Sequence, residues 1–351
     1  MPHRWIFFLT FFLTGSACFS QDTIRVLHYT EVTGFNHSTQ TVSKNFFERI
    51  CDTLTATTPH VWLLTDSDSS ETFDNLSALQ QYKVVIWANT SGASGLTPAQ
   101  RQNYELYVNS GGSYLGVHAA SDTYRHSTAN GTNTGAWDFY AENMAGCSVQ
   151  ENPNHTAANH NNDMNHVAVH PILNGLPNPW NKTEEYYYWE NGFLDTSFTE
   201  LLRVNATGIN PYDSARMTAH CKEHAWGSRS FYTSLGHDVS NYTSDAEFEL
   251  LLRNALYWTA NPVPSGVAET EYGVIMVYPN PFFQTLTITS TSNEPSQITI
   301  CNTLGQIVYA EEFLQSATID LSFLSSGIYC VAIINRKEVR TQRVIKEESV
   351  H

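Results

Sequence analysis

Three histidines follow predicted strands at the points where those strands end. His118 comes directly after Gly111–Val117, which reads as a tight turn and a short buried strand, so it lies on a sharp elbow. His237 follows Gly236 at the end of a late strand, and His37 lies in the loop after the first strand. Residues at the carboxyl ends of parallel strands face a common crevice. Because histidine can bind a metal or exchange a proton, these residues predict a reactive site.

Two carboxylates are candidates to join these histidines. Glu185 lies beside an aromatic run, and Asp122 follows the elbow. Since two or three histidines with a carboxylate suit zinc, manganese or iron, we predict a divalent metal held by His37, His118 and His237. The predicted catalytic residues are His118, His237, Glu185 and Asp122. Without a metal, the same histidines could transfer protons while Glu185 or Asp122 orients them, and Asp122 could instead cap the following helix.

Other aromatic and histidine side chains have either binding or packing roles. Tyr187 and Trp189 lie in the run 186–189, which predicts either an aromatic platform for a sugar or a buried strand. His155 is a predicted substrate contact. His28 adjoins a buried strand and is predicted to be a core residue. Three further histidines lie in an Asn-rich stretch that indicates a solvated loop: His160, His166 and His170.

The segment 21–262 alternates strand and helix patterns. Strands are predicted at 24–30, 61–65, 83–88, 114–117 and 229–235, and helices at 38–54 (with Ser38 as its cap), 73–80, 97–109 and 246–259. This rhythm predicts an α/β fold with a doubly wound, mostly parallel, flavodoxin-like sheet. The Asn- and His-rich stretch 131–174 is predicted to be an irregular insertion that serves the site.

The composition narrows the class of ligand. The 351 residues carry a formal net charge of −16 with only 18 Lys and Arg, which argues against nucleic-acid binding. Charged residues make up only 15% of the chain, and tyrosine, asparagine, serine and threonine abound. Such a surface suits neutral polar ligands, and a carbohydrate is the predicted partner.

The two ends of the chain differ from this segment. Arg4 and the apolar run 5–13 predict a signal peptide over 1–20, and no later stretch predicts a transmembrane segment. After a linker at 263–276, the part 277–351 shows short alternating β runs that predict a small all-β sandwich. Two of these runs carry Cys301 and Cys330, whose pairing the sequence leaves open.

Five stretches of the α/β segment, taken in order, resemble a known family: Thr33–His37, Gly111–Thr123, His170–Pro171 with Leu176–Pro177, Thr183–Tyr187 and Gly227–His237. The segment resembles ThuA-like domains of the trehalose-utilisation family, which have a class I glutamine amidotransferase-like fold. His220 stands about where the family often has tryptophan, and we take it as a further substrate-binding residue. The elbow carries His118 in place of a cysteine, which argues against amidotransferase activity.

The tail has a resemblance of its own. Val277–Phe282, Leu321–Tyr329 and the basic ending 340–346 resemble the C-terminal sorting domain of type IX secretion in Bacteroidetes. This implies passage through the type IX secretion machinery to the cell surface or exterior. Together the resemblances imply an exported hydrolase or lyase that acts on a glycoside or keto-sugar derivative. The alternative is a non-catalytic glycan-binding module.

Overall fold

The computed structural model describes residues 22–93, 95–129, 131, 137–208, 213–262, 275–290, 295–303, 305–334 and 339–347. The chain divides into two compact units, Met1–Ser265 and Gly266–His351, which are considered separately. The predicted signal peptide and most of the predicted linker lie outside the described residues. No described helix has the length and apolar character needed to cross a membrane.

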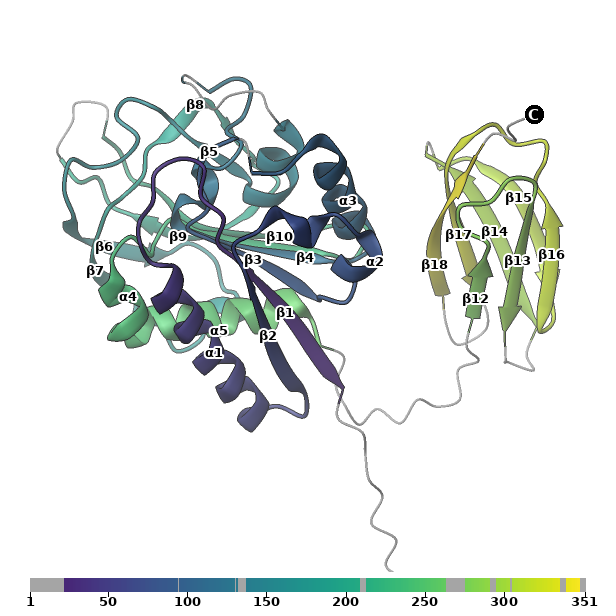
Figure 1. The fold of residues 1–351 in the computed structure, drawn as a ribbon, viewed down its shortest axis with the longest axis horizontal. Helices are drawn as coiled ribbons and strands as arrows, with labels where there is room; N and C mark the ends of the chain where they lie inside the picture. Colours follow the sequence, from purple (N-terminus) through teal and green to yellow (C-terminus); the bar gives the residue numbers. More distant parts are fainter. Residues whose placement is uncertain are drawn as a thin grey trace, which may run out of the picture. The chain divides into compact units, whose positions relative to one another are not determined.

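The first unit is built on a sheet whose strands run in the order β2-β1-β3-β4-β11-β10-β9-β6-β7 (Figure 1). Five neighbours are parallel: β2 (Val61–Ser67), β1 (Thr23–Tyr29), β3 (Val84–Ala88), β4 (Ser113–Val117) and β11 (Arg229–Thr233). Four antiparallel strands extend this core: β10 (Arg216–Glu223), β9 (Thr199–Val204), β6 (His160–His166) and β7 (Trp180–Glu184). The α/β class with a parallel core is confirmed, and the antiparallel extension adds to it.

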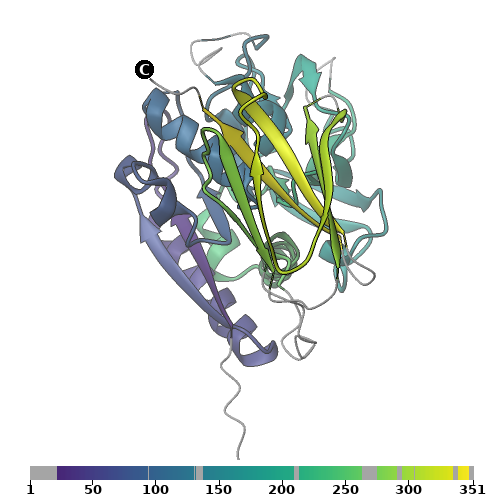
Figure 2. The same ribbon diagram turned by 90° about the vertical axis from the view of Figure 1, so that its right-hand side faces the viewer.

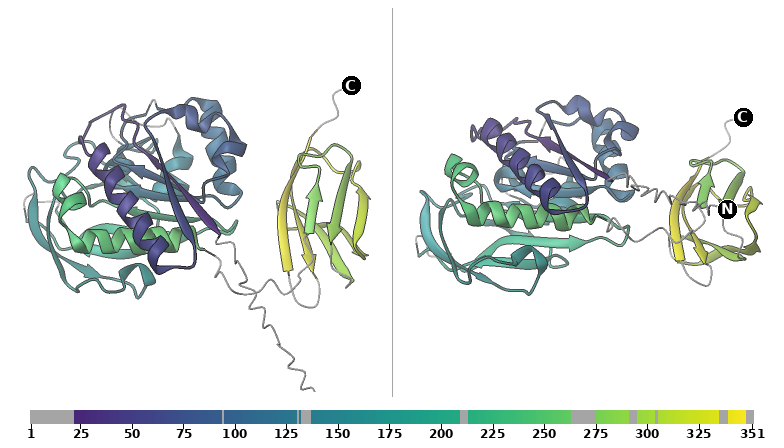
Figure 3. Two further views of the ribbon diagram at one scale, coloured as in Figure 1. Left: turned by 60° about the horizontal axis from the view of Figure 1, so that its bottom comes forward. Right: turned by 90° about the horizontal axis from the view of Figure 1, so that it is seen from below.

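The parallel strands are apolar on both faces because both faces are covered. Along β3, Val84 and Ile86 pack into one buried cluster, whereas Val85 and Trp87 pack into another. Successive side chains of a strand point to opposite faces, so an unbroken apolar run requires a layer on each side. The helices α1 (Gln40–Thr57) and α5 (Ala246–Ala260) lie side by side on one face, and α3 (Pro98–Asn109) lies over the other (Figures 1 and 3).

The helix termini follow local rules with one exception. α3 begins with a reciprocal capping box between Thr97 and Gln100, with Pro98 in its first turn. The predicted cap Ser38 is wrong, because α1 begins at Gln40 and Ser38 adopts a left-handed φ of 56°. The predicted helix 73–80 is instead a short 3₁₀ helix, Ser70–Phe73, followed by α2 (Leu76–Leu79). Helix α4 (Val239–Thr243) precedes α5.

The stretch 131–174 is more regular than predicted. It contains a π-helical turn at Tyr140–Ala145, the strand β5 (Cys147–Val149), which pairs with β8 (Trp189–Leu194), and the strand β6. The prediction of a solvated loop is therefore wrong for His160 and His166, which lie on β6. Ladder hydrogen bonds come from the backbone, so a strand of polar residues forms here with Met164 as its buried side chain.

The second unit is the predicted small β-sandwich (Figure 2). One sheet contains β12 (Ile275–Tyr278), β13 (Thr285–Ser290) and β16 (Ser316–Asp320); the other contains β15 (Ile307–Phe313), β14 (Ser296–Asn302), β17 (Gly327–Ile334) and β18 (Val339–Lys346). Alternate residues such as Leu286, Ile300 and Val331 form its core. Cys301 and Cys330 are directly opposite in the β14–β17 ladder and both are free thiols.

Gly236 yields a stability prediction. Its φ is 116°, and an added Cβ would lie 2.8 Å from the Tyr242 hydroxyl and 2.9 Å from a Val117 methyl. Gly111 has a similar φ of 102° but open space around it. Both Gly→Ala changes should strain the backbone, and Gly236→Ala should lower the free energy of unfolding by roughly 1–3 kcal/mol more because it also collides with the core.

The measurement is chemical denaturation followed by tryptophan fluorescence. All 8 tryptophans lie between Trp5 and Trp258, so the signal reports on the first unit alone. Equal losses in the two variants would contradict the expected collision at Gly236.

Candidate active site

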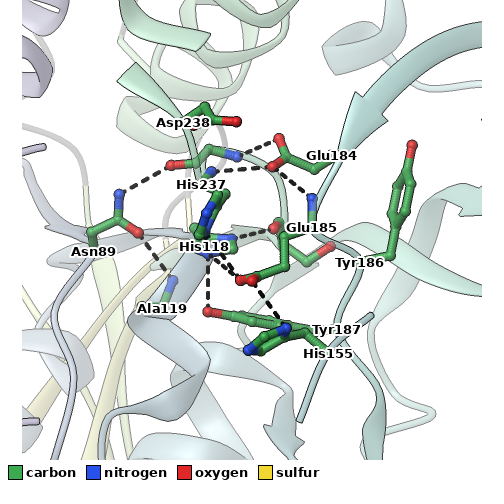
Figure 4. A network of polar contacts seen from close by, with 12 residues as sticks. Asn89, His118, Ala119, His155, Glu184, Glu185, Tyr186, Tyr187, His237 and Asp238 are labelled. Carbon is green, nitrogen blue, oxygen red and sulfur yellow. Dashed lines mark hydrogen bonds and ion pairs between the residues drawn. The ribbon is translucent and has the colours of Figure 1, made fainter. Parts of the chain in front are cut away.

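The site lies at the carboxyl ends of the parallel strands. His118 follows β4 directly and has a left-handed φ of 48°, the sharp elbow expected from the sequence. His37 lies in the loop between β1 and α1, and His237 follows β11 through Gly236. Glu185 comes from the other half of the sheet, as the first residue after β7. Four segments far apart in the sequence thus meet at one point. Figure 4 shows three of them through His118, Glu185 and His237.

The donor atoms of this group are close together. The Oε2 of Glu185 lies 3.1 Å from Nδ1 of His237 and 3.5 Å from Nε2 of His118. The two imidazole nitrogens are 3.3 Å apart. A nitrogen or carboxylate oxygen from each of the four residues, His37 included, lies within 4.8 Å of the others. The predicted metal ligands are therefore brought together, with Glu185 among them.

The orientation of His118 is fixed on both sides of its ring. Its Nδ1 lies 2.7 Å from the Ser234 carbonyl, so Nδ1 carries the hydrogen and Nε2 faces the cluster with its lone pair. The Tyr187 ring stacks on the imidazole at 4.5 Å, and the Tyr187 hydroxyl donates to Nε2 over 3.1 Å. A carbonyl that holds the outer nitrogen is the usual support of a metal-binding histidine.

His37 approaches from the side. Its ring is edge-on to those of His118 and His237, with centroids 4.7 and 5.3 Å away. Its Nδ1 is buried and has no hydrogen-bond partner among the described residues. Burial, and then the neighbouring His118 and His237, lower the pKa of His37 to about 3. His37 is therefore neutral over the ordinary pH range, which is the state a metal ligand requires.

The Glu185 carboxylate lies within ion-pair distance of the imidazoles of His118, His155 and His237. Burial alone would raise the pKa of this carboxyl, but the neighbouring imidazoles of His118, His155 and His237 lower that pKa well below its usual range. The bond to Glu185 in turn raises the pKa of His237. The other carboxylate oxygen, Oε1, lies 2.9 Å from Nδ1 of His155. This residue is partly exposed, and the sequence predicts it only as a substrate contact.

A second layer holds these residues, and sequence reasoning missed it. The buried Glu184 accepts the backbone N–H groups of Gly236 and His237 at 3.0 and 3.3 Å. Asn89, directly after β3, donates to the Gly236 carbonyl at 3.1 Å and accepts the Ala119 N–H at 3.2 Å. Both loops that carry a central histidine are therefore anchored (Figure 4). The only local signal for Glu184 was its position beside Glu185.

The spacing of the donor atoms can be compared with the spacing around a bound metal ion. With ligand bonds of about 2.1 Å, two donors of a tetrahedral ion are about 3.4 Å apart. The separations of 3.1, 3.3 and 3.5 Å among Glu185, His118 and His237 agree with that spacing. A ring nitrogen of His37, within 4.8 Å of the other three donors, supplies a fourth donor. Three imidazoles and one carboxylate are a donor set that suits zinc, manganese or iron.

The remaining predicted residues lie elsewhere or play other parts. Asp122 ends the 3₁₀ helix after the elbow and pairs with Arg125 at 3.2 Å, without capping a helix. His220 is buried on β10 and bonds to the Ala145 carbonyl, so the structure does not bring it to the cluster. Trp189 donates its N–H to the Met217 carbonyl. His28 is fully buried and bonded to Asp66 and Ser43, as predicted for a core residue.

The aromatic run 186–188 is buried, which agrees with the packing alternative and not with an open platform. The exposed fraction of Tyr187 is 4%, although its hydroxyl reaches His118. The buried thiols also lack the character of a nucleophile: burial raises the pKa of Cys221 to about 12 and that of Cys147 well above its usual value. Neither lies on the elbow, which His118 occupies.

Comparison with known proteins agrees with this architecture. Residues 25–259 match the ThuA family, described as trehalose utilisation, and residues 276–347 match the secretion system C-terminal sorting domain. A solved ThuA-like protein from Bacteroides uniformis ATCC 8492 shares the fold, with a TM-score of 0.51, 18% identity, and coverage of 70% of this chain and 94% of that chain. No curated protein matches the sequence.

A further solved structure is the BSP domain of a biofilm-associated protein. It has a TM-score of 0.18 and 7% identity, over 56% of this chain and 26% of that chain, which is too low to indicate a shared fold. The sorting domain indicates export by type IX secretion to the cell surface or exterior. The family match spans about two thirds of the chain, including all but the first two residues of the nine-stranded sheet and the residues that meet at its edge. The chain therefore belongs to the ThuA family, as an exported member with a type IX sorting tail.

Proposed function

We propose that this protein is an exported enzyme that uses a divalent metal ion, zinc, manganese or iron, to hydrolyse or eliminate a glycoside or a keto-sugar derivative. The convergence of His37, His118, Glu185 and His237 is the observation that carries the proposal. A sugar substrate is supported by the family's description and by the low proportion of charged residues in the chain.

The four converging residues would hold the ion. When bound, it would act as a Lewis acid toward a sugar oxygen or lower the pKa of a water molecule. The Ser234 carbonyl and the Tyr187 ring keep His118 Nε2 directed at that position. Glu184 does the same for His237, because it fixes the backbone N–H of that residue.

His155 is the residue best suited to move a proton. Its Nδ1 is held by Glu185 Oε1 and by the Thr156 carbonyl at 2.7 Å, which leaves Nε2 free to act. Burial alone would lower the pKa of His155, but these hydrogen bonds raise it above its ordinary value. With a side chain 31% exposed, His155 can take a proton from a sugar carbon next to a carbonyl and give it to the leaving oxygen.

Metal content tests the proposal directly. The unit 21–262, purified without a chelator or histidine tag, should contain about one ion per chain, and His118→Ala should reduce that content about tenfold or more. His170→Asn is the matched control, since it removes an imidazole that caps a 3₁₀ helix elsewhere in the domain. Elemental analysis is the measurement. Absence of metal from the wild type would favour the non-catalytic glycan-binding alternative.

Metal affinity should depend on pH. His237 has a raised pKa in the metal-free site, so a metal must displace its proton. Affinity should therefore be highest above that pKa and fall by about tenfold per pH unit below it, because the proton competes for the same nitrogen. Calorimetry between pH 8 and 6, in buffers of different ionisation enthalpy, should detect proton release. A constant affinity without proton release would contradict the assignment of His237 as a ligand.

Loss of His155 should separate chemistry from metal binding. His155→Gln should lower kcat by about 10²–10³ on a glycoside that the wild type cleaves, with unchanged metal content, because only the proton-transfer group is removed. His160→Gln on β6 is the matched control. Full activity of His155→Gln would show that another group moves the proton.

A further inference from the structure

Phe35 is exposed beside the cluster. The side chain is 67% exposed, although phenylalanine is strongly apolar, and it lies two residues before the candidate ligand His37. Its ring meets that of His37 edge to face, with centroids 4.8 Å apart and an interplanar angle of 79°. The His37 ring also contacts the rings of His118 and His237 edge to face. Phe35 is therefore one ring removed from the candidate metal ligands.

The loop that carries Phe35 is held in place by its neighbour. The Ser91 carbonyl accepts the N–H groups of Thr33 and Gly34 at 2.9 and 3.1 Å. The Ser91 hydroxyl donates to the carbonyl of Phe35 itself at 2.7 Å. These bonds join the loop after β1 to the loop after β3. These hydrogen bonds hold the backbone at Phe35 in place, so the exposure of its ring is a fixed feature of the surface.

Close packing at Gly92 tightens this connection. Its φ is 89°, and an added Cβ would lie 2.4 Å from Thr33 Oγ1 and 2.7 Å from the Gly34 nitrogen. Only glycine allows the two loops to approach so closely. The backbone that carries the ring therefore has little conformational freedom left to lose on binding, which favours affinity.

We infer that Phe35 is a substrate-binding residue, on which the apolar C–H face of a pyranose ring stacks while its hydroxyl edge turns toward the metal cluster. The inference rests on the proposed function for its sugar substrate. An aromatic face offers apolar area and a negative π surface, which complement the C–H groups of one sugar face. Because Tyr186, Tyr187 and Tyr188 are buried, they cannot offer such a face.

The test is equilibrium binding of neutral glucosides (trehalose, cellobiose and methyl glucoside) to the metal-loaded full-length protein, by titration calorimetry. Phe35→Ala should raise the Kd for these sugars about tenfold, because the stacking ring is removed. The Kd values of Phe35→Tyr and Phe35→Trp should stay within about twofold of the wild-type value. Trp226→Ala is the matched control. Trp226 is also an exposed aromatic residue (40%), stacked on His224, but it lies in the turn before β11, at the strand end opposite the site.

Metal content and oligomeric state are measured on every variant. Equal sugar affinity of wild type and Phe35→Ala would overturn the inference and leave the proposed function standing. A wild-type dimer that Phe35→Ala dissociates would also overturn it, because Phe35 would then contact a second copy of the chain and not a sugar. Metal-loaded wild type that binds none of the glucosides would also overturn it. Failure of the proposed function would be recognised separately, by a wild type without metal.

Discussion

The buried contact between Glu184 and the Gly236–His237 backbone is the constraint on which the site depends. β7 is four strands away from β11 in the sheet, a distance of about 19 Å across a flat sheet at the usual strand spacing. Yet the Glu184 carboxylate lies 3.0 Å from the Gly236 nitrogen. The antiparallel half must therefore curl back over the end of β11, around α5 (Figure 3). Register shifts in the β9–β10 pairing accompany this curl, as bulges do in curved sheets.

Two adjacent carboxylates perform different tasks because the curl gives them different surroundings. Glu184 faces inward and accepts N–H groups, including one from the Asn241 side chain at 3.0 Å, so it stabilises the backbone. Glu185 faces the crevice, where three histidines compensate its burial. Neighbouring residues after a strand point in opposite directions, which lets one turn both close the fold and complete the site.

Sequence reasoning found the residues whose role follows from local pattern. His37, His118 and His237 each follow a recognisable strand, and strand ends of a parallel sheet meet at one edge, so their convergence could be predicted. Glu184 could not, because its partners are defined only by the curl. Asn89 could not either, because its partners lie in the loops after β4 and β11 and no local pattern marks it. β6 was missed since its polar residues show no period of two. His220 looked like a site residue, but its position on β10 turns it toward Ala145.

The wide spacing of the four candidate ligands has a consequence for how the protein matures. They span residues 37 to 237, so an unfolded chain cannot offer the same set to one ion. Any metal held there would act as a cross-link of the native state only, and its full binding free energy would add to stability. Metal binding would then follow folding of the domain, because the four residues meet only in the native state.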